Sequence, residues 1–145
     1  MRKYISENIK DCYFLCADMW NFEFKHKSVK KIDTLLCEST LLNIATGLSL
    51  LNTNIYIYGV AGFIIHKYEP LKYSLLDTIR KTNSTLTFLN AGKIGYNDYY
   101  HQLHDDLDLM KINNVPTFSP YTIQELKNIL ENKEQIKYIQ LWKDF

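Results

Sequence analysis

The sequence has almost no net charge and few glycines and prolines. Seventeen basic and sixteen acidic residues give a formal charge of +1, so there is no electrostatic reason to expect nucleic acid or an anionic membrane as a partner. The five glycines and three prolines form no linker, repeat or low-complexity tract. With 46% hydrophobic residues over a length of 145, the composition is that of a globular protein, and we expect one domain over residues 1–145.

The sequence also has little cysteine and no apolar run at its start. The segment MRKYISENIKD turns polar at once, whereas a signal peptide or transmembrane helix needs a long apolar stretch. We therefore expect a cytoplasmic protein. Cys12, Cys16 and Cys37 are odd in number and lack a second ligand pair at zinc spacing. We expect reduced thiols, the first two buried on a strand.

Apolar runs typical of strands alternate with helical periodicities. Strands are predicted over residues 12–18, 54–60, 84–90 and 137–142, with a short extended piece at 115–118. Helices are predicted over 38–50, 62–81, 104–111 and 120–131. Pro70 should kink or split the second helix, because proline has no amide donor. The segment KHKSVKK is predicted to be a surface segment.

This alternation predicts an α/β fold with a mostly parallel sheet flanked by helices on both faces. Ligands of such sheets bind beyond the carboxyl ends of the strands, which directs attention to Asp18, to Gly62 and Phe63, and to the loop over 91–101. Gly47 lowers the stability of its predicted helix, so we expect it to pack closely against another backbone.

Single polar residues establish little. Glu38 at a helix start could simply compensate the helix dipole, and His101 and His104 could be surface residues. The tyrosines between 96 and 100 could fill a protein interface. The sequence contains no nucleophile elbow, P-loop, His-Glu-x-x-His or Gly-Asp-Gly motif.

Four segments in a fixed order are more informative. They are Ala17-Asp18, Glu38 followed by Ala45-Thr-Gly47-Leu48, Phe63-Ile-Ile-His66-Lys-Tyr68-Glu69-Pro70-Leu71, and a run from Gly92 through His101 and Asp105-Asp106 to Ser119-Pro120. Their order and spacing resemble the pyrimidine-binding domain of transketolases and deoxyxylulose phosphate synthases, from Asp18 almost to the last residue. The resemblance implies the thiamine-diphosphate-binding fold.

The resemblance also implies roles for particular residues. Glu38 would share a proton with the N1′ atom of thiamine diphosphate, and Phe63 would stack on the pyrimidine ring. His101 would face the substrate, and Asp18 would lie near the cofactor at a subunit boundary. Val60 and His66 would also contact the cofactor, and they depart from the family pattern, which has an aromatic residue and an Arg or Tyr there.

The family holds the diphosphate and its metal on a separate domain with a Gly-Asp-Gly motif, which this sequence lacks. The resemblance therefore implies a partner chain that binds the diphosphate and Mg²⁺, in a heterotetramer or with a homodimer of this chain. The expected activity is transfer of a two-carbon ketol unit between sugars, from a sugar phosphate or nucleotide-sugar substrate. Alternatives are a subunit of a 2-oxo acid decarboxylase or dehydrogenase, a non-catalytic interaction module, and an unrelated flavodoxin-like fold.

Overall fold

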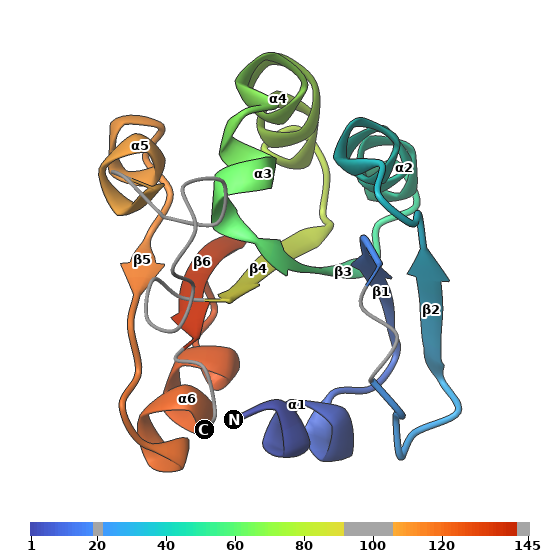
Figure 1. Cartoon of the computed structure of the whole chain (residues 1–145), viewed down its shortest axis with the longest axis vertical. Coiled ribbons are helices and arrows are strands. Elements are labelled where there is room, and N and C mark those ends of the chain that lie inside the picture. The colour runs from blue at the N-terminus through green and yellow to red at the C-terminus, as the bar shows by residue number, and fades with distance from the viewer. Residues whose placement is uncertain (19–21, 92–105, 142–145) are drawn as a thin grey trace.

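The computed structural model describes residues 1–18, 22–91 and 106–141, which form a sheet with helices on both of its faces (Figure 1). Within these residues the sheet has six strands in the order β2-β1-β3-β4-β6-β5, and all of its strand pairs are parallel. The strands are β1 Cys12–Cys16, β2 Val29–Asp33, β3 Asn54–Val60, β4 Thr85–Ala91, β5 Thr117–Phe118 and β6 Ile136–Leu141. The predicted α/β class with a parallel sheet is confirmed.

The helices form two layers. They are α1 Arg2–Asn8, α2 Glu38–Ser49, α3 Ala61–Ile65, the π-helical segment η1 Pro70–Leu76, α4 Asp77–Ile79, α5 Asp106–Ile112 and α6 Ile123–Glu131. In Figure 1, α2, α3, α4 and α5 cover one face of the sheet, and α1 and α6 cover the other. Among the described residues, no helix is both long and apolar enough to cross a membrane.

Each face of the sheet has its own hydrophobic core. Leu15, Ile55 and Ile57 point to the α2 side, where Leu41 and Leu75 are also fully buried. On the opposite side Phe14, Tyr58 and Ile139 pack against residues of α1 and α6. Because both faces are covered, the central strands are continuous apolar runs, which explains why β1, β3, β4 and β6 could be predicted from the sequence.

Two elements differ from the sequence-based expectation. The segment predicted as a surface stretch contains the edge strand β2. This strand carries Lys30 and Lys31, and charged residues on an edge strand commonly prevent it from pairing with strands of other molecules. Helix α1 was not predicted. It buries Ile5 completely against the second core, although its sequence is mostly polar.

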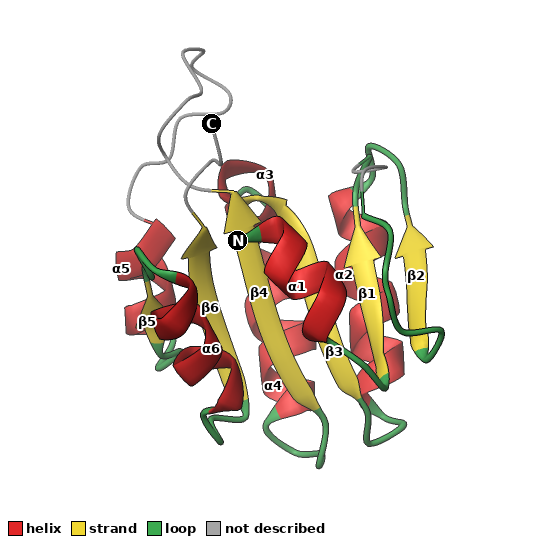
Figure 2. Ribbon diagram, turned by 90° about the horizontal axis from the view of Figure 1, so that it is seen from below, coloured by secondary structure: helices red, strands yellow, loops and turns green. Residues whose placement is uncertain are grey.

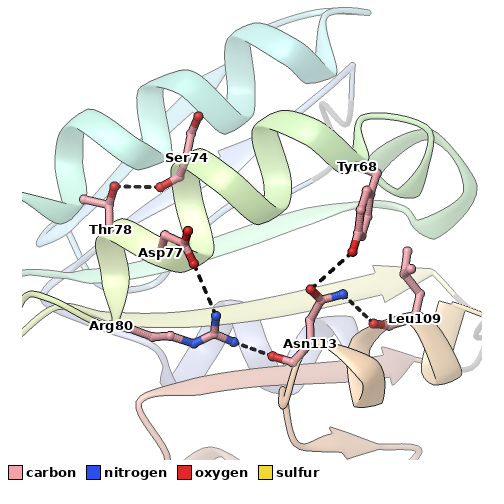
Figure 3. A network of polar contacts seen from close by, with 7 residues as sticks. All are labelled: Tyr68, Ser74, Asp77, Thr78, Arg80, Leu109 and Asn113. Atoms are coloured by element: carbon pink, nitrogen blue, oxygen red, sulfur yellow. Dashed lines mark hydrogen bonds and ion pairs between the residues drawn. The ribbon is translucent and has the colours of Figure 1, made fainter.

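The predicted helix over 62–81 is broken, but the break lies at residues 66–67, ahead of Pro70, and Tyr68 and Glu69 are already helical. Helix α3 ends at Ile65, and Pro70 begins η1, a position at which proline does not disrupt the hydrogen-bond ladder. A polar network then fastens η1 and α4 to the end of α5 (Figure 3). Arg80 donates to the carbonyl oxygen of Asn113 and pairs with Asp77 at 3.6 Å, and the Asn113 side chain donates to Leu109 O at 2.8 Å.

The expectation for Gly47 was wrong. A Cβ atom built on this residue would have nothing within 4 Å, and the residue is exposed on α2. Since no described residue packs against the position of a Cβ atom, the glycine lowers the stability of α2 through its flexible backbone.

We therefore predict that Gly47→Ala stabilises the protein by about 0.8–1 kcal/mol, the difference in helix propensity between the two residues. Urea denaturation followed by circular dichroism measures the change. Gly59→Ala is the matched control, because a Cβ there would lie 3.2 Å from the Ile64 Cδ1 atom and should give no gain. A Gly47→Ala protein that is no more stable than wild type would contradict the conclusion that residue 47 lies in a regular helix with free space around its Cβ position.

A buried hydrogen-bonded chain joins α5 to β6 and β4. The Tyr138 hydroxyl donates to Asp106 Oδ2 at 2.7 Å and accepts from Asn90 Nδ2 at 2.7 Å, and all three residues are buried. Burial, followed by the negative charge of Asp106, raises the pKa of Tyr138 well above its ordinary value. The tyrosine therefore stays a neutral donor to the carboxylate across the physiological pH range.

Tyr138→Phe should destabilise the protein by about 1–3 kcal/mol, because a buried carboxylate loses its shortest hydrogen bond. Thermal or chemical denaturation measures the loss. Tyr73→Phe, at a residue that is 62% exposed, is the control and should change stability little. Equal stabilities for the two variants would show that the buried chain contributes nothing.

Candidate functional site

A cavity of about 190 Å³ opens at the carboxyl ends of β1 and β3. Asp18, Glu38, Val60 and Phe63, which were singled out from the sequence, all line it. Figure 2 shows the strands running in the same direction, with α3 beside the edge where they end. Because β1 and β3 are adjacent and parallel, with Cys16 opposite Tyr58, the residues that follow the two strands meet at this edge.

The remaining walls of the cavity are mostly apolar. Leu41, Tyr58 and Ile64 are at most 1% exposed and line the cavity from α2, β3 and α3. Leu36, which is 78% exposed, forms part of the rim. The site thus combines a dry interior with a rim that carries carboxylates, an arrangement suited to holding a flat, partly polar ring.

Glu38 is the first residue of α2 and follows the N-cap Cys37. A carboxylate at this end of a helix is stabilised by the helix dipole, so a purely structural role would place it here as well. What distinguishes Glu38 is its neighbourhood. It lines the same cavity as Phe63 and is itself partly exposed.

Phe63 reaches the cavity because α3 begins directly after β3. Val60 is the last residue of the strand and Ala61 the first of the helix, so Phe63 lies in the first helical turn. Gly59 allows this close approach, since a Cβ there would meet the Ile64 side chain at 3.2 Å. Val60 lines the cavity with a small aliphatic side chain where the family pattern has an aromatic ring.

One predicted site residue, His66, is not brought into this cavity. His66 is the exposed C-cap of α3 and does not line the cavity. His101, together with the loop around it, lies outside the described residues. Roles for these histidines remain predictions from the sequence.

Sequence reasoning missed Asp33, which ends β2 opposite Cys16. Its Oδ1 atom accepts hydrogen bonds from the backbone amides of Asp18 and Leu35, both at 2.9 Å. Burial acts to raise the pKa of Asp33, but these two amides, with the Cys16 thiol and Lys31, outweigh it and the net pKa is lowered. Recognition of β2 as a strand was the signal that could have found this residue.

The three cysteines form no disulfide, and Cys12 and Cys16 are buried, as predicted. Cys37 is exposed at the start of α2. Its Sγ atom lies 2.8 Å from Thr40 Oγ1, and hydrogen bonds from the side chain and backbone of Thr40 lower its pKa. Among the described ranges, no three histidine, cysteine or acidic side chains are placed to hold a metal ion.

The described residues therefore define an α/β protein with a ligand-sized cavity at the carboxyl edge of a parallel sheet. The same fold occurs in a solved split-gene transketolase, an inactive β4 tetramer, with a TM-score of 0.65 and 22% sequence identity. The likeness covers 92% of this chain and 45% of that one, so the chain spans less than half of the length of its structural relative. No protein-family model and no curated protein matches the sequence. The predicted transketolase-like fold is confirmed by this likeness.

We predict that iodoacetamide modifies Cys37 selectively in the folded protein. Its lowered pKa increases the thiolate fraction below pH 9, whereas burial, followed by the charge of Asp11, raises the pKa of Cys12 to about 12. Mass spectrometry of peptides after timed labelling measures the rates. Cys37→Ser is the control and should leave the native protein unlabelled until denaturant exposes the other cysteines. Rapid native labelling of Cys12 or Cys16 would contradict the packing described above.

Proposed function

We propose that this chain is the pyrimidine-domain subunit of a split, thiamine-diphosphate-dependent, transketolase-like enzyme. Its activity would be the transfer of a two-carbon ketol unit between sugars, with a partner chain completing the site. The observation that carries the proposal is the single cavity that gathers Asp18, Glu38 and Phe63 from three separate segments. The shared fold with a split-gene transketolase supports it.

The cavity residues fit the pyrimidine half of thiamine diphosphate. Apolar side chains of Leu41 and Ile64 would face the ring, the aromatic ring of Phe63 would stack on it, and the Glu38 carboxyl could reach a ring nitrogen at its edge. The cofactor also carries a diphosphate, which is neutralised by a divalent metal and by donors. We assign these to the partner chain, because the sequence has no Gly-Asp-Gly motif.

Thiamine diphosphate, when bound, supplies both the nucleophilic carbon and the amino group that takes a proton from it. Glu38 would share one proton between its carboxyl group and the ring nitrogen, which would make the exocyclic nitrogen of the ring a better base. Phe63 would fix the plane of the ring and exclude water from one of its sides. A strong proton-sharing bond at Glu38 requires low polarity around the carboxyl.

Glu38 is only partly buried in this chain, and Asp18 and Leu36 are exposed at the cavity rim. The proposal therefore needs the partner chain to cover the rim and to complete the burial of the carboxyl group. Asp18 would lie at this boundary, near the cofactor. Val60 leaves more room beside the ring than an aromatic residue would. His66, which does not line the cavity, would contact the cofactor from outside its wall, and the resemblance gives His101 a role toward the substrate.

The test is to assemble the chain with a diphosphate-domain partner, thiamine diphosphate and Mg²⁺, and to follow ketol transfer between sugar phosphates. Glu38→Gln should lower kcat by about 100-fold or more, the usual contribution of a positioned acid–base group. The amide has nearly the same size, so assembly should be unchanged. Glu7→Gln, an exposed change on α1, is the control.

Turnover by Glu38→Gln equal to that of wild type would overturn the catalytic assignment. A 2-oxo acid offered as an alternative donor separates the two branches of thiamine chemistry. Carbon dioxide release from that donor without transfer between sugars would replace the sugar-based activity with decarboxylation. Stable assembly without either reaction in the wild-type enzyme would identify a non-catalytic interaction module.

A further inference from the structure

Asp33 joins two segments that both contribute residues to the cavity. One oxygen atom, Oδ1, accepts the amide of Asp18, which follows β1, and the amide of Leu35, which follows β2. Asp18 lines the cavity directly, and Leu35 precedes Leu36, which also lines it.

Both amides belong to residues in a strained backbone conformation. Asp18 has φ of 54° and Leu35 has φ of 55°, which is the left-handed region that residues with a Cβ atom rarely adopt. A hydrogen bond to a charged acceptor is stronger than one to a neutral acceptor. The two hydrogen bonds to Asp33 thus stabilise the left-handed backbone conformations of both Asp18 and Leu35. Removal of the carboxylate would leave both conformations without this stabilisation.

The turn that Asp33 holds leads directly to Glu38. After Leu35, the Cys37 amide donates to Leu35 O at 2.8 Å, and α2 begins at Glu38. On the strand side, the amide and hydroxyl of Thr34 both donate to Cys16 O, at 2.9 and 3.3 Å. These bonds fix the end of β2 to the end of β1, so the position of Glu38 relative to Asp18 depends on this short connection.

The second oxygen of the carboxylate gives an independent indication of constraint. Asp33 Oδ2 is buried and has no hydrogen-bond partner among the described residues. A buried polar atom without a partner lowers stability. Strained backbone of the kind found at Asp18 and Leu35 clusters at functional sites, where the surrounding structure holds it in place.

We propose that Asp33 is a positioning residue that sets the distance between Asp18 and the Glu38 carboxyl group through the turn at Leu35. It contacts neither the cofactor nor the substrate and acts only through these backbone amides. The catalytic part of this inference rests on the proposed function, whereas the structural part does not.

The first experiment uses the chain alone. In Asp33→Ala, hydrogen exchange of the Asp18 and Leu35 amides should accelerate by about tenfold or more, since both lose their acceptor. Asp33→Asn retains a neutral oxygen of the same size, so we expect partial rescue, with rates between those of wild type and Asp33→Ala. Asp108→Ala is the control, because Asp108 forms only an exposed pair with Lys111.

The second experiment uses the assembled enzyme with its partner, thiamine diphosphate and Mg²⁺, normalised to the number of sites that bind cofactor. Asp33→Ala should lower kcat per site by about 10- to 100-fold, the effect of a small misplacement of a catalytic group, with the KM for the donor sugar nearly unchanged. Asp33→Asn should recover part of kcat. A role confined to folding would lower the number of sites and leave kcat per site intact.

The two experiments fail independently. Unchanged amide exchange in both Asp33 variants would overturn the positioning role, whatever the activity. Accelerated exchange with wild-type kcat per site would overturn its link to Glu38. Accelerated exchange in the variants, combined with an inactive wild-type enzyme, would instead overturn the proposed function. If Asp33→Ala does not fold, the comparison between Asp33→Asn and wild type decides the first two outcomes.

Discussion

The parallel pairing of β1 with both of its neighbours is the constraint on which the site depends. Cys16 lies opposite Asp33 on β2 and opposite Tyr58 on β3, so β1 and β2 end level with each other while β3 runs two residues further, to Val60. A shift of one residue in either pairing would turn the side chains of a strand to the opposite face. The burial of Phe14 in one core and Leu15 in the other prevents this shift. Packing deep in the sheet therefore determines which side chains meet at its edge.

The cavity is built on a rigid aromatic support. Tyr58, which lines the cavity, also belongs to the core beneath α1, where its ring lies 4.7 Å from that of Phe22. Phe14 contacts both Phe22 and Phe24, with ring centroids 4.9 and 4.7 Å apart. Such ring pairs contribute beyond the area that they bury. This connection explains how α1, which takes no part in the cavity, supports the position of the cavity wall.

The sequence predicted the parts of this structure that depend on strong local patterns. The limits of β3 were predicted without error, and the start of α2 at Glu38 followed from amphipathicity. The predicted break in the helix over 62–81 is present, but it lies at residues 66–67 and not at Pro70. Edge strand β2 was missed because Lys30 and Lys31 obscure its short apolar pattern. The expectation for Gly47 was wrong because a helix tolerates a glycine at an exposed position, where no other segment packs against it. Sequence periodicity does not show which segments pack against a residue.

The residues of the candidate site were likewise predicted only in part. Asp18, Glu38, Val60 and Phe63 were identified by their order along the chain, and parallel pairing brings them together. Asp33 could not be identified in that way, because its role depends on hydrogen bonds to two backbone amides in left-handed conformation. Only recognition of β2 as a strand, with Asp33 at its carboxyl end, would have pointed to this residue. The prediction for His66 failed in the opposite way. This residue belongs to one of the ordered motifs, but its side chain does not line the cavity.

The central claim is that this cavity holds the pyrimidine ring of a cofactor whose diphosphate is bound by another chain. A crystal structure of the chain with a diphosphate-binding partner, thiamine diphosphate and Mg²⁺ tests it most directly. The account predicts a Glu38 carboxyl oxygen within about 3.2 Å of the N1′ atom, with the Phe63 ring stacked on the pyrimidine. A pyrimidine ring bound elsewhere, or a partner interface that leaves this cavity open to solvent, would contradict it.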